Sequence, residues 1–133
     1  MTSSKILHDI VSQSSTILSI SQMAQFMYEL SEPMEEQLEI IMDTAHEIVD
    51  LSGQIGLIFD AADEGESLDK ATADPLLNKQ LFSATAKINE TVQQFLAIEG
   101  VPDEMQEDLN RIIAAVDETN NLAENLSKIL AEA

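Results

Sequence analysis

The chain has 133 residues and is strongly acidic, because 25 Asp and Glu face 6 Lys and Arg, a formal net charge of −19, while 44% of its residues are hydrophobic. One domain of this length can bury a core, and the charge excludes polyanions such as nucleic acid and anionic lipid as partners. The lack of cysteine excludes disulfides, thiolate metal sites and cysteine nucleophiles. Because neither a secretory signal nor a membrane-spanning apolar run is evident, we expect a cytoplasmic monomer or homodimer that binds protein partners, with no membrane or nucleic-acid contact.

The first predicted helix occupies the segment before the turn "LSEPMEE". Its apolar residues recur at alternating steps of four and three, with Gln13 at the one polar step, and they are Ile6, Ile10, Ile17, Ile20, Ala24 and Met27. This spacing is typical of helices that pack along nearly aligned neighbours. His8 shares the polar face of this helix with Ser12, Ser15 and Ser19, so we expect its imidazole to be exposed.

The second predicted helix follows Pro33, a residue suited to a first helical turn. Its apolar positions, broken by Ser52, are Met34, Leu38, Ile41, Ala45, Ile48, Ile55 and Phe59. A neighbouring stripe, expected outside or at the rim of the core, is formed by Asp43, Glu47, Asp50, Gln54 and Leu57. Asp50 and Gln54 are one turn apart on this stripe and therefore face the same patch of surface.

Two glycines interrupt the second helix beside this pair. Gly53 and Gly56 each cost about 1 kcal/mol in a helix interior compared with alanine. One interpretation is that they clear the surface beside Asp50 and Gln54, so that a partner's backbone can approach. The other is that they thin the helix for close packing against a neighbour in the same molecule.

A long acidic connection, residues 60–75, leads to the second half of the chain, and Asp74–Pro75 is the predicted start of the third helix. The apolar positions of the third helix, broken by Thr91, are Leu77, Leu81, Ala84, Ile88, Phe95 and Ile98. The fourth predicted helix follows a turn at Gly100 and Pro102. Its apolar positions, with Thr119 at the one polar step, are Met105, Leu109, Ile112, Val116, Ala123, Leu126 and Leu130.

The two halves of the chain also resemble each other. Residues 4–62 align without a gap on residues 75–133, a shift of 71 positions that superposes every heptad position of the first two predicted helices on one of the last two. Identical pairs include Ser12/Ser83, Met34/Met105, Leu38/Leu109, Glu47/Glu118 and Leu51/Leu122. A helical hairpin cannot bury its own apolar stripe, whereas two facing hairpins can. The sequence therefore predicts an all-α, antiparallel four-helix bundle of two pseudo-repeated hairpins within a single domain, residues 1–133.

Most methionines and aromatic residues are expected in the core by their spacing, including Met23, Phe26 and Met27, although those near the turn at 28–34 would also suit an adaptable binding surface. Asp43 and His46 have the spacing of half a carboxylate-bridged two-metal site. The fourth helix offers no second motif of this kind, so we expect no metal.

"DLSGQI", residues 50–55, resembles the DLTGQV stretch of the CheZ chemotaxis phosphatases, and Glu47 and Ile48 partly match its lead-in. The resemblance implies a regulator of two-component signalling that binds a response-regulator receiver domain and removes its phosphate. It implies that Asp50 pairs with a lysine of the regulator and that Gln54 orients the attacking water, with Glu47 and Gly53 on the binding surface. Mg²⁺ would belong to the receiver, so no cofactor is expected in this chain. The chain is shorter than those proteins and joins two hairpins in one polypeptide.

A second stretch, "LHDIVSQSSTI", is similar to the His-Asp-x-x-x-Gln phosphoacceptor helix of sensor histidine kinases. This resemblance implies a phosphotransfer protein in which His8 carries phosphate, Asp9 is its acid/base neighbour and Gln13 orients water. Lys79 replaces His8 in the second hairpin, which leaves one such site. A third hypothesis is a non-catalytic acidic module that binds or inhibits a protein partner, including as a DNA mimic.

Overall fold

The computed structural model describes residues 2–133, and over that range it contains helices and connecting turns but no strand. Four long helical segments follow one another along the chain: α1 (Ser3–Met27), α2 (Glu32–Asp63), a composite third segment and α5 (Asp103–Glu132). The third segment consists of α3 (Lys70–Asp74), the π-helical turn η1 (Pro75–Leu81) and α4 (Phe82–Leu96), which are contiguous. The expectation of an all-helical chain with four long helices is confirmed.

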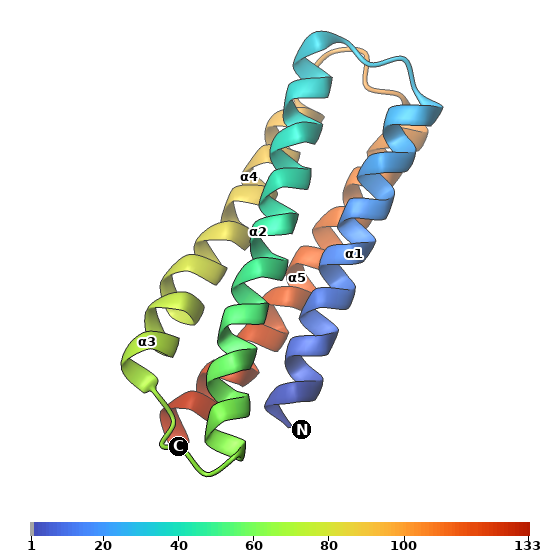
Figure 1. The fold of residues 1–133 in the computed structure, drawn as a ribbon. Helices are drawn as coiled ribbons and strands as arrows, with labels where there is room; N and C mark the ends of the chain where they lie inside the picture. The colour runs from blue at the N-terminus through green and yellow to red at the C-terminus, as the bar shows by residue number, and fades with distance from the viewer. Residues whose placement is uncertain (1) are drawn as a thin grey trace.

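The four segments lie side by side (Figure 1), and each runs back toward the start of the one before it. α1 contacts α2 and α5, and α4 contacts the same two helices. The apolar faces meet along the axis of this arrangement, where they form one core. Every predicted apolar step is buried except Ile98, which is half-buried, and Met27, which is exposed.

The third segment begins earlier than Asp74–Pro75, so the prediction for its start is wrong. α2 continues to Asp63 and α3 begins at Lys70, which shortens the connection to residues 64–69. Asp69 caps the new start, because its carboxylate accepts hydrogen bonds from Thr72 N at 3.2 Å and Thr72 Oγ1 at 2.8 Å. Pro75, which lacks an N–H and crowds the preceding turn, stands at the first position of η1, where the helix widens.

The burial pattern repeats with the same 71-residue shift as the sequence. Each residue from 32 to 60 falls in the same burial class as the residue 71 positions further along. α2 and α5 also begin at equivalent residues, Glu32 and Asp103. The two glycines of left-handed backbone, Gly65 with φ of 103° and Gly100 with φ of 87°, lie in the connections after α2 and α4.

Small hydroxyl side chains interrupt the apolar core. Ser52, Thr91 and Thr119, the predicted polar steps, are buried, and each donates to the carbonyl four residues earlier at 2.7–2.8 Å. In α1 the buried polar residues are Ser14 and Ser21, whereas the expected Gln13 is half-buried. An α-helix has 3.6 residues per turn, so the residues three and four positions after Ile10 both lie near the buried face. The residue that is buried there is Ser14, four positions on, and not Gln13, three positions on.

Candidate functional site

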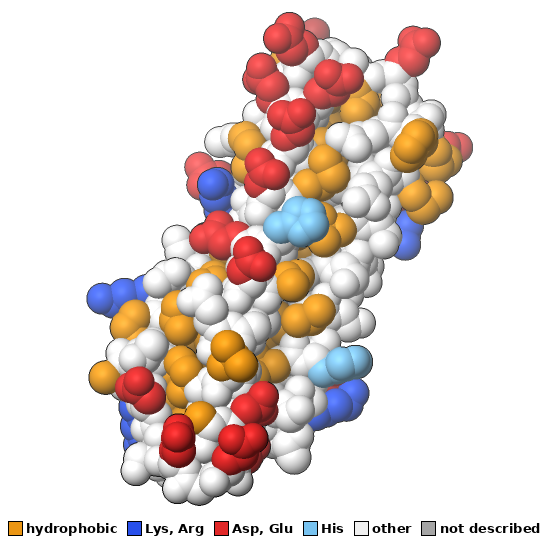
Figure 2. Space-filling model, viewed as in Figure 1, with side chains coloured by type: hydrophobic (Ala, Val, Ile, Leu, Met, Phe, Trp, Pro, Cys, Tyr) orange, Lys and Arg blue, Asp and Glu red, His pale blue; other side chains and the backbone are white. Residues whose placement is uncertain are grey.

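The outer face of α2 carries the residues predicted to form the site. Every member of the stripe is exposed, in agreement with the prediction: Asp43, Glu47, Asp50, Gln54 and Leu57. Leu57 is a large apolar side chain with 71% of its surface accessible. Figure 2 shows acidic side chains from the upper end of the molecule down to its middle and again near its lower end, with hydrophobic side chains visible among them. The stripe therefore combines polar, charged and apolar groups on an uninterrupted helix.

Asp50 and Gln54 stand one helical turn apart within α2. Within residues 2–133, neither side chain has a hydrogen-bond or ion-pair partner, and both are exposed. A carboxylate and an amide held in this way on a continuous helix are available to another molecule.

The two glycines of α2 have different surroundings. A Cβ added to Gly53 would meet no atom within 4 Å, so Gly53 does not serve packing within the molecule. A Cβ on Gly56 would meet Leu7 Cδ1 at 3.8 Å, an ordinary contact that alanine would tolerate. The packing interpretation of these glycines is therefore wrong, and Gly53 leaves the surface next to Gln54 open.

Glu47 lines a groove of about 380 Å³ together with residues of η1 and α4, namely Lys79, Gln80, Ser83, Ala84 and Lys87. This groove places two of the six cationic side chains beside the α2 stripe. Sequence reasoning noted Lys79 only as the counterpart of His8 and missed Lys87, because the pairing of α4 with α2 decides which α4 residues border Glu47.

The second predicted site lies on α1. The His8 side chain is 79% exposed, as expected, and its Nδ1 lies 3.5 Å from Asp9 Oδ1. The Lys5 ammonium, 2.9 Å from the same oxygen, lowers the pKa of Asp9 below its ordinary value. Gln13 is half-buried and forms no hydrogen bond with His8 or Asp9 within residues 2–133, so the structure does not bring the three residues together as a unit.

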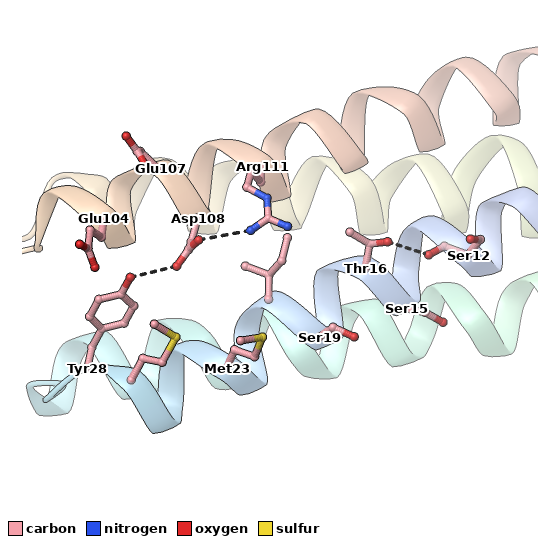
Figure 3. A pocket seen from close by; sticks show the side chains of 12 residues that line it. Ser12, Ser15, Thr16, Ser19, Met23, Tyr28, Glu104, Glu107, Asp108 and Arg111 are labelled. Atoms are coloured by element: carbon pink, nitrogen blue, oxygen red, sulfur yellow. Dashed lines mark hydrogen bonds and ion pairs between the residues drawn. The ribbon is translucent and has the colours of Figure 1, made fainter.

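A larger groove of about 660 Å³ is lined by residues of α1 and α5, and the sequence did not predict it. Its lining residues are Ser12, Ser15, Thr16, Ser19, Ile20, Met23, Met27, Tyr28, Glu104, Glu107, Asp108 and Arg111 (Figure 3). We refer to it as the α1–α5 groove. Met23 and Met27 are each 59% exposed, and the neighbouring Phe26 is 92% exposed, which corrects their predicted place in the core. At the end of α1 the two methionine side chains line the open groove beside α5 rather than the core, so the heptad step there meets solvent.

Polar contacts fix one end of the α1–α5 groove. Tyr28 donates its hydroxyl hydrogen to Asp108 Oδ2 at 3.1 Å, and Arg111 Nη1 lies 3.5 Å from Asp108 Oδ1. Partial burial, followed by the hydrogen bond to Asp108, raises the pKa of Tyr28 above its ordinary value. These contacts hold the groove wall of α5 against the end of α1.

Over residues 2–133, no group of three or more His, Cys, Asp or Glu side chains is arranged to hold a metal ion. No helix in the same range combines the length and the apolar character needed to cross a bilayer. Comparisons of the chain with protein-family models, with curated proteins and with solved structures gave no match.

Proposed function

We propose that this protein regulates two-component signalling by binding a receiver domain and promoting its dephosphorylation, in the manner of the CheZ phosphatases. The observation that carries the proposal is the exposure of Asp50 and Gln54, one turn apart on α2, with open space beside them at Gly53. A side chain can reach into another protein's phosphorylated pocket only from such a position.

The proposed chemistry is hydrolysis of the receiver's aspartyl phosphate. Water attacks phosphorus as the bond to the receiver's carboxylate oxygen breaks, which gives inorganic phosphate and the free carboxylate. The Gln54 amide oxygen accepts a hydrogen bond from the attacking water and holds it in line. Asp50 accepts a charge-assisted hydrogen bond from a lysine of the receiver. The metal ion on the phosphoryl group belongs to the receiver, so this chain supplies only positioning.

We also infer that the molecule is an antiparallel four-helix bundle of two pseudo-repeated hairpins. The repeated burial pattern and the equivalent starts of α2 and α5 support this inference. The contacts of α1 with α5 and of α4 with α2 also support it, because the 71-residue shift relates one pair of helices to the other. The counterparts of Asp50 and Gln54 are Asn121 and Asn125. The second hairpin thus lacks the carboxylate and carries a shorter amide, so the proposed site exists once per chain.

The test measures phosphate release from a panel of phosphorylated receiver domains, each with and without this protein. We expect faster release from at least one receiver. Gln54→Ala should lower the maximal rate because the water loses its positioning group, whereas Asp50→Asn should mainly raise the receiver concentration needed for half-maximal rate. Circular dichroism should show unchanged folding of both variants, since both side chains are exposed. An unchanged rate for Gln54→Ala removes this pair from the function.

A second candidate is phosphotransfer through His8, which the 79% exposure of its side chain favours. In that case the wild type incubated with a phosphorylated receiver acquires acid-labile phosphate, and His8→Ala does not. A third candidate is a non-catalytic acidic binding module. It predicts a stable complex in which the lifetime of the receiver's phosphate does not change.

A further inference from the structure

The α1–α5 groove has two walls of different chemistry. The α1 wall begins with the hydroxyls of Ser12, Ser15, Thr16 and Ser19 and ends with Met23 and Met27. The α5 wall carries Glu104, Glu107, Asp108 and Arg111. In Figure 3 Glu104 and Tyr28 face each other across one end, while Glu107 stands on the outer rim. The α1 wall is therefore polar at one end and apolar at the other, whereas the α5 wall is mainly acidic.

The exposed apolar side chains at one end of this groove are suited to bind the apolar surface of a partner protein. Met23 and Met27 are each 59% exposed, and Phe26 beside them is 92% exposed. Flexible thioether side chains adapt to different apolar surfaces, and clusters of this kind are used to bind amphipathic helices. The short hydroxyl side chains further along α1 leave room for a partner's backbone to come close.

The negative charge of the α5 wall favours a cationic partner in the groove. Arg111 lies near Asp108, at 3.5 Å, whereas Glu104 and Glu107 form no ion pair within residues 2–133. A cationic partner would be attracted both to this wall and to a chain with a net charge of −19. A second copy of this protein would bring the same negative charge to the contact, so self-association is disfavoured.

The length of the groove sets the size of the occupant. Its α1 wall extends from Ser12 to Tyr28, about 24 Å at the helical rise of 1.5 Å per residue. This span matches a helix of about 16 residues, or more than four turns.

We propose that the α1–α5 groove binds a basic amphipathic helix of a partner protein. The apolar face of that helix packs on Met23 and Met27, and its lysine or arginine side chains face Glu104 and Glu107. This binding site lies on different helices from Asp50 and Gln54, and it does not depend on phosphatase activity.

The test uses a fluorescein-labelled 16-residue peptide of leucine and lysine in amphipathic helical order, with fluorescence anisotropy as the readout. A second peptide has the same composition in scrambled order, so that it has the same charge but no apolar face. We expect the wild type to bind the first peptide at least tenfold more tightly than the scrambled one. Bound peptide should also shift the methyl NMR signals of Met23 and Met27. No binding of the amphipathic peptide, or equal binding of both, overturns the proposal.

Variants locate the contact. Met23→Ser/Met27→Ser should weaken binding of the amphipathic peptide at least tenfold. Glu104→Gln/Glu107→Gln should weaken it severalfold and reduce its dependence on salt. The control Glu36→Gln/Glu39→Gln removes two exposed carboxylates at the same three-residue spacing on α2, and it should bind like the wild type. Equal losses in both carboxylate pairs would show general attraction to an acidic surface and would contradict a defined groove, as would formation of dimers through the methionines.

Discussion

The two interfaces between the hairpins, α1 against α5 and α4 against α2, have equivalent places in the repeat but different surfaces. Most of their buried residues follow one pattern, although buried Leu7 corresponds to exposed Asn78. On the surface, Thr16, Ser19 and Met23 of α1 correspond to Lys87, Glu90 and Gln94 of α4, which changes a small and apolar wall into a charged one. Core packing constrains which positions are apolar, whereas exposed positions are free to differ, so we expect specific sites where the exposed residues of the two interfaces differ.

The largest expected effect comes from a buried position where the two interfaces also differ. Phe95 of α4 is fully buried, and its counterpart in α1 is Ala24. Phe95→Ala should lower the free energy of unfolding by about 3–5 kcal/mol, because it removes a large buried ring and leaves a cavity. Urea unfolding followed by circular dichroism measures the change. A loss below about 1 kcal/mol would mean that the interface does not depend on this ring.

The next comparison is between two equivalent buried hydroxyls. Thr85 Oγ1 lies 2.9 Å from Phe82 O and 2.6 Å from Asn120 Oδ1, whereas Ser14 Oγ has no partner in the described chain. Thr85→Val should therefore lower the free energy of unfolding by about 1 kcal/mol. Ser14→Ala should leave it unchanged or raise it by about 1 kcal/mol, because an unpaired buried hydroxyl is removed. Losses of equal size in the two urea titrations would show that the hydroxyls are equivalent after all.

The glycines of α2 separate stability from the proposed activity. Gly53→Ala and Gly56→Ala should each raise the free energy of unfolding by about 0.5–1 kcal/mol, because alanine favours the helix and neither added Cβ meets a clash. Gly53→Ala places a methyl group beside Gln54 and should slow phosphate release, whereas Gly56→Ala is the matched control with unchanged release. Destabilisation by either substitution would indicate a packing role that the structure does not support.

The smallest expected effect is a pH shift at one end of the α1–α5 groove. Tyr28 is the only tyrosine, so ultraviolet absorbance of tyrosinate reports it alone. Its raised folded-state pKa means that the neutral phenol is favoured in the native protein, so this contribution to stability is full below the unfolded pKa of about 10 and is lost as the pH rises above it. The native midpoint should exceed that in concentrated urea, and Asp108→Asn should reduce the difference. Identical native and urea midpoints would rule out the contact between Tyr28 and Asp108 in solution.

The sequence predicted the helices well because burial is periodic along them. The alternating steps placed Leu38, Ile48 and Leu126 in the core, and the polar stripe placed Asp50 and Gln54 outside. The pattern failed where local chemistry or the end of a helix decides the outcome. A carboxylate cap at Asp69 begins the third segment before Pro75. Met27 is the last residue of α1, and its side chain lines the open α1–α5 groove instead of the core.

The candidate sites were predictable only in part, for a related reason. Exposure of His8 and Gln54 follows from periodicity within one helix. The α1–α5 groove and the lysines beside Glu47 require knowledge of which helices are neighbours, and spacing within one helix does not contain that information. The openness beside Gly53 likewise depends on what every other segment leaves uncovered.

The central claim is that the amide on α2 performs a task that its counterpart on α5 does not. The most direct measurement compares Gln54→Ala with Asn125→Ala in single-turnover phosphate release from the same phosphorylated receiver domain. Both positions are exposed at equivalent places in the repeat, so both variants should fold like the wild type. We expect a loss of about 100-fold for Gln54→Ala, the size typical of a misplaced reacting group, and no change for Asn125→Ala. Equal rates in the two variants would contradict the account.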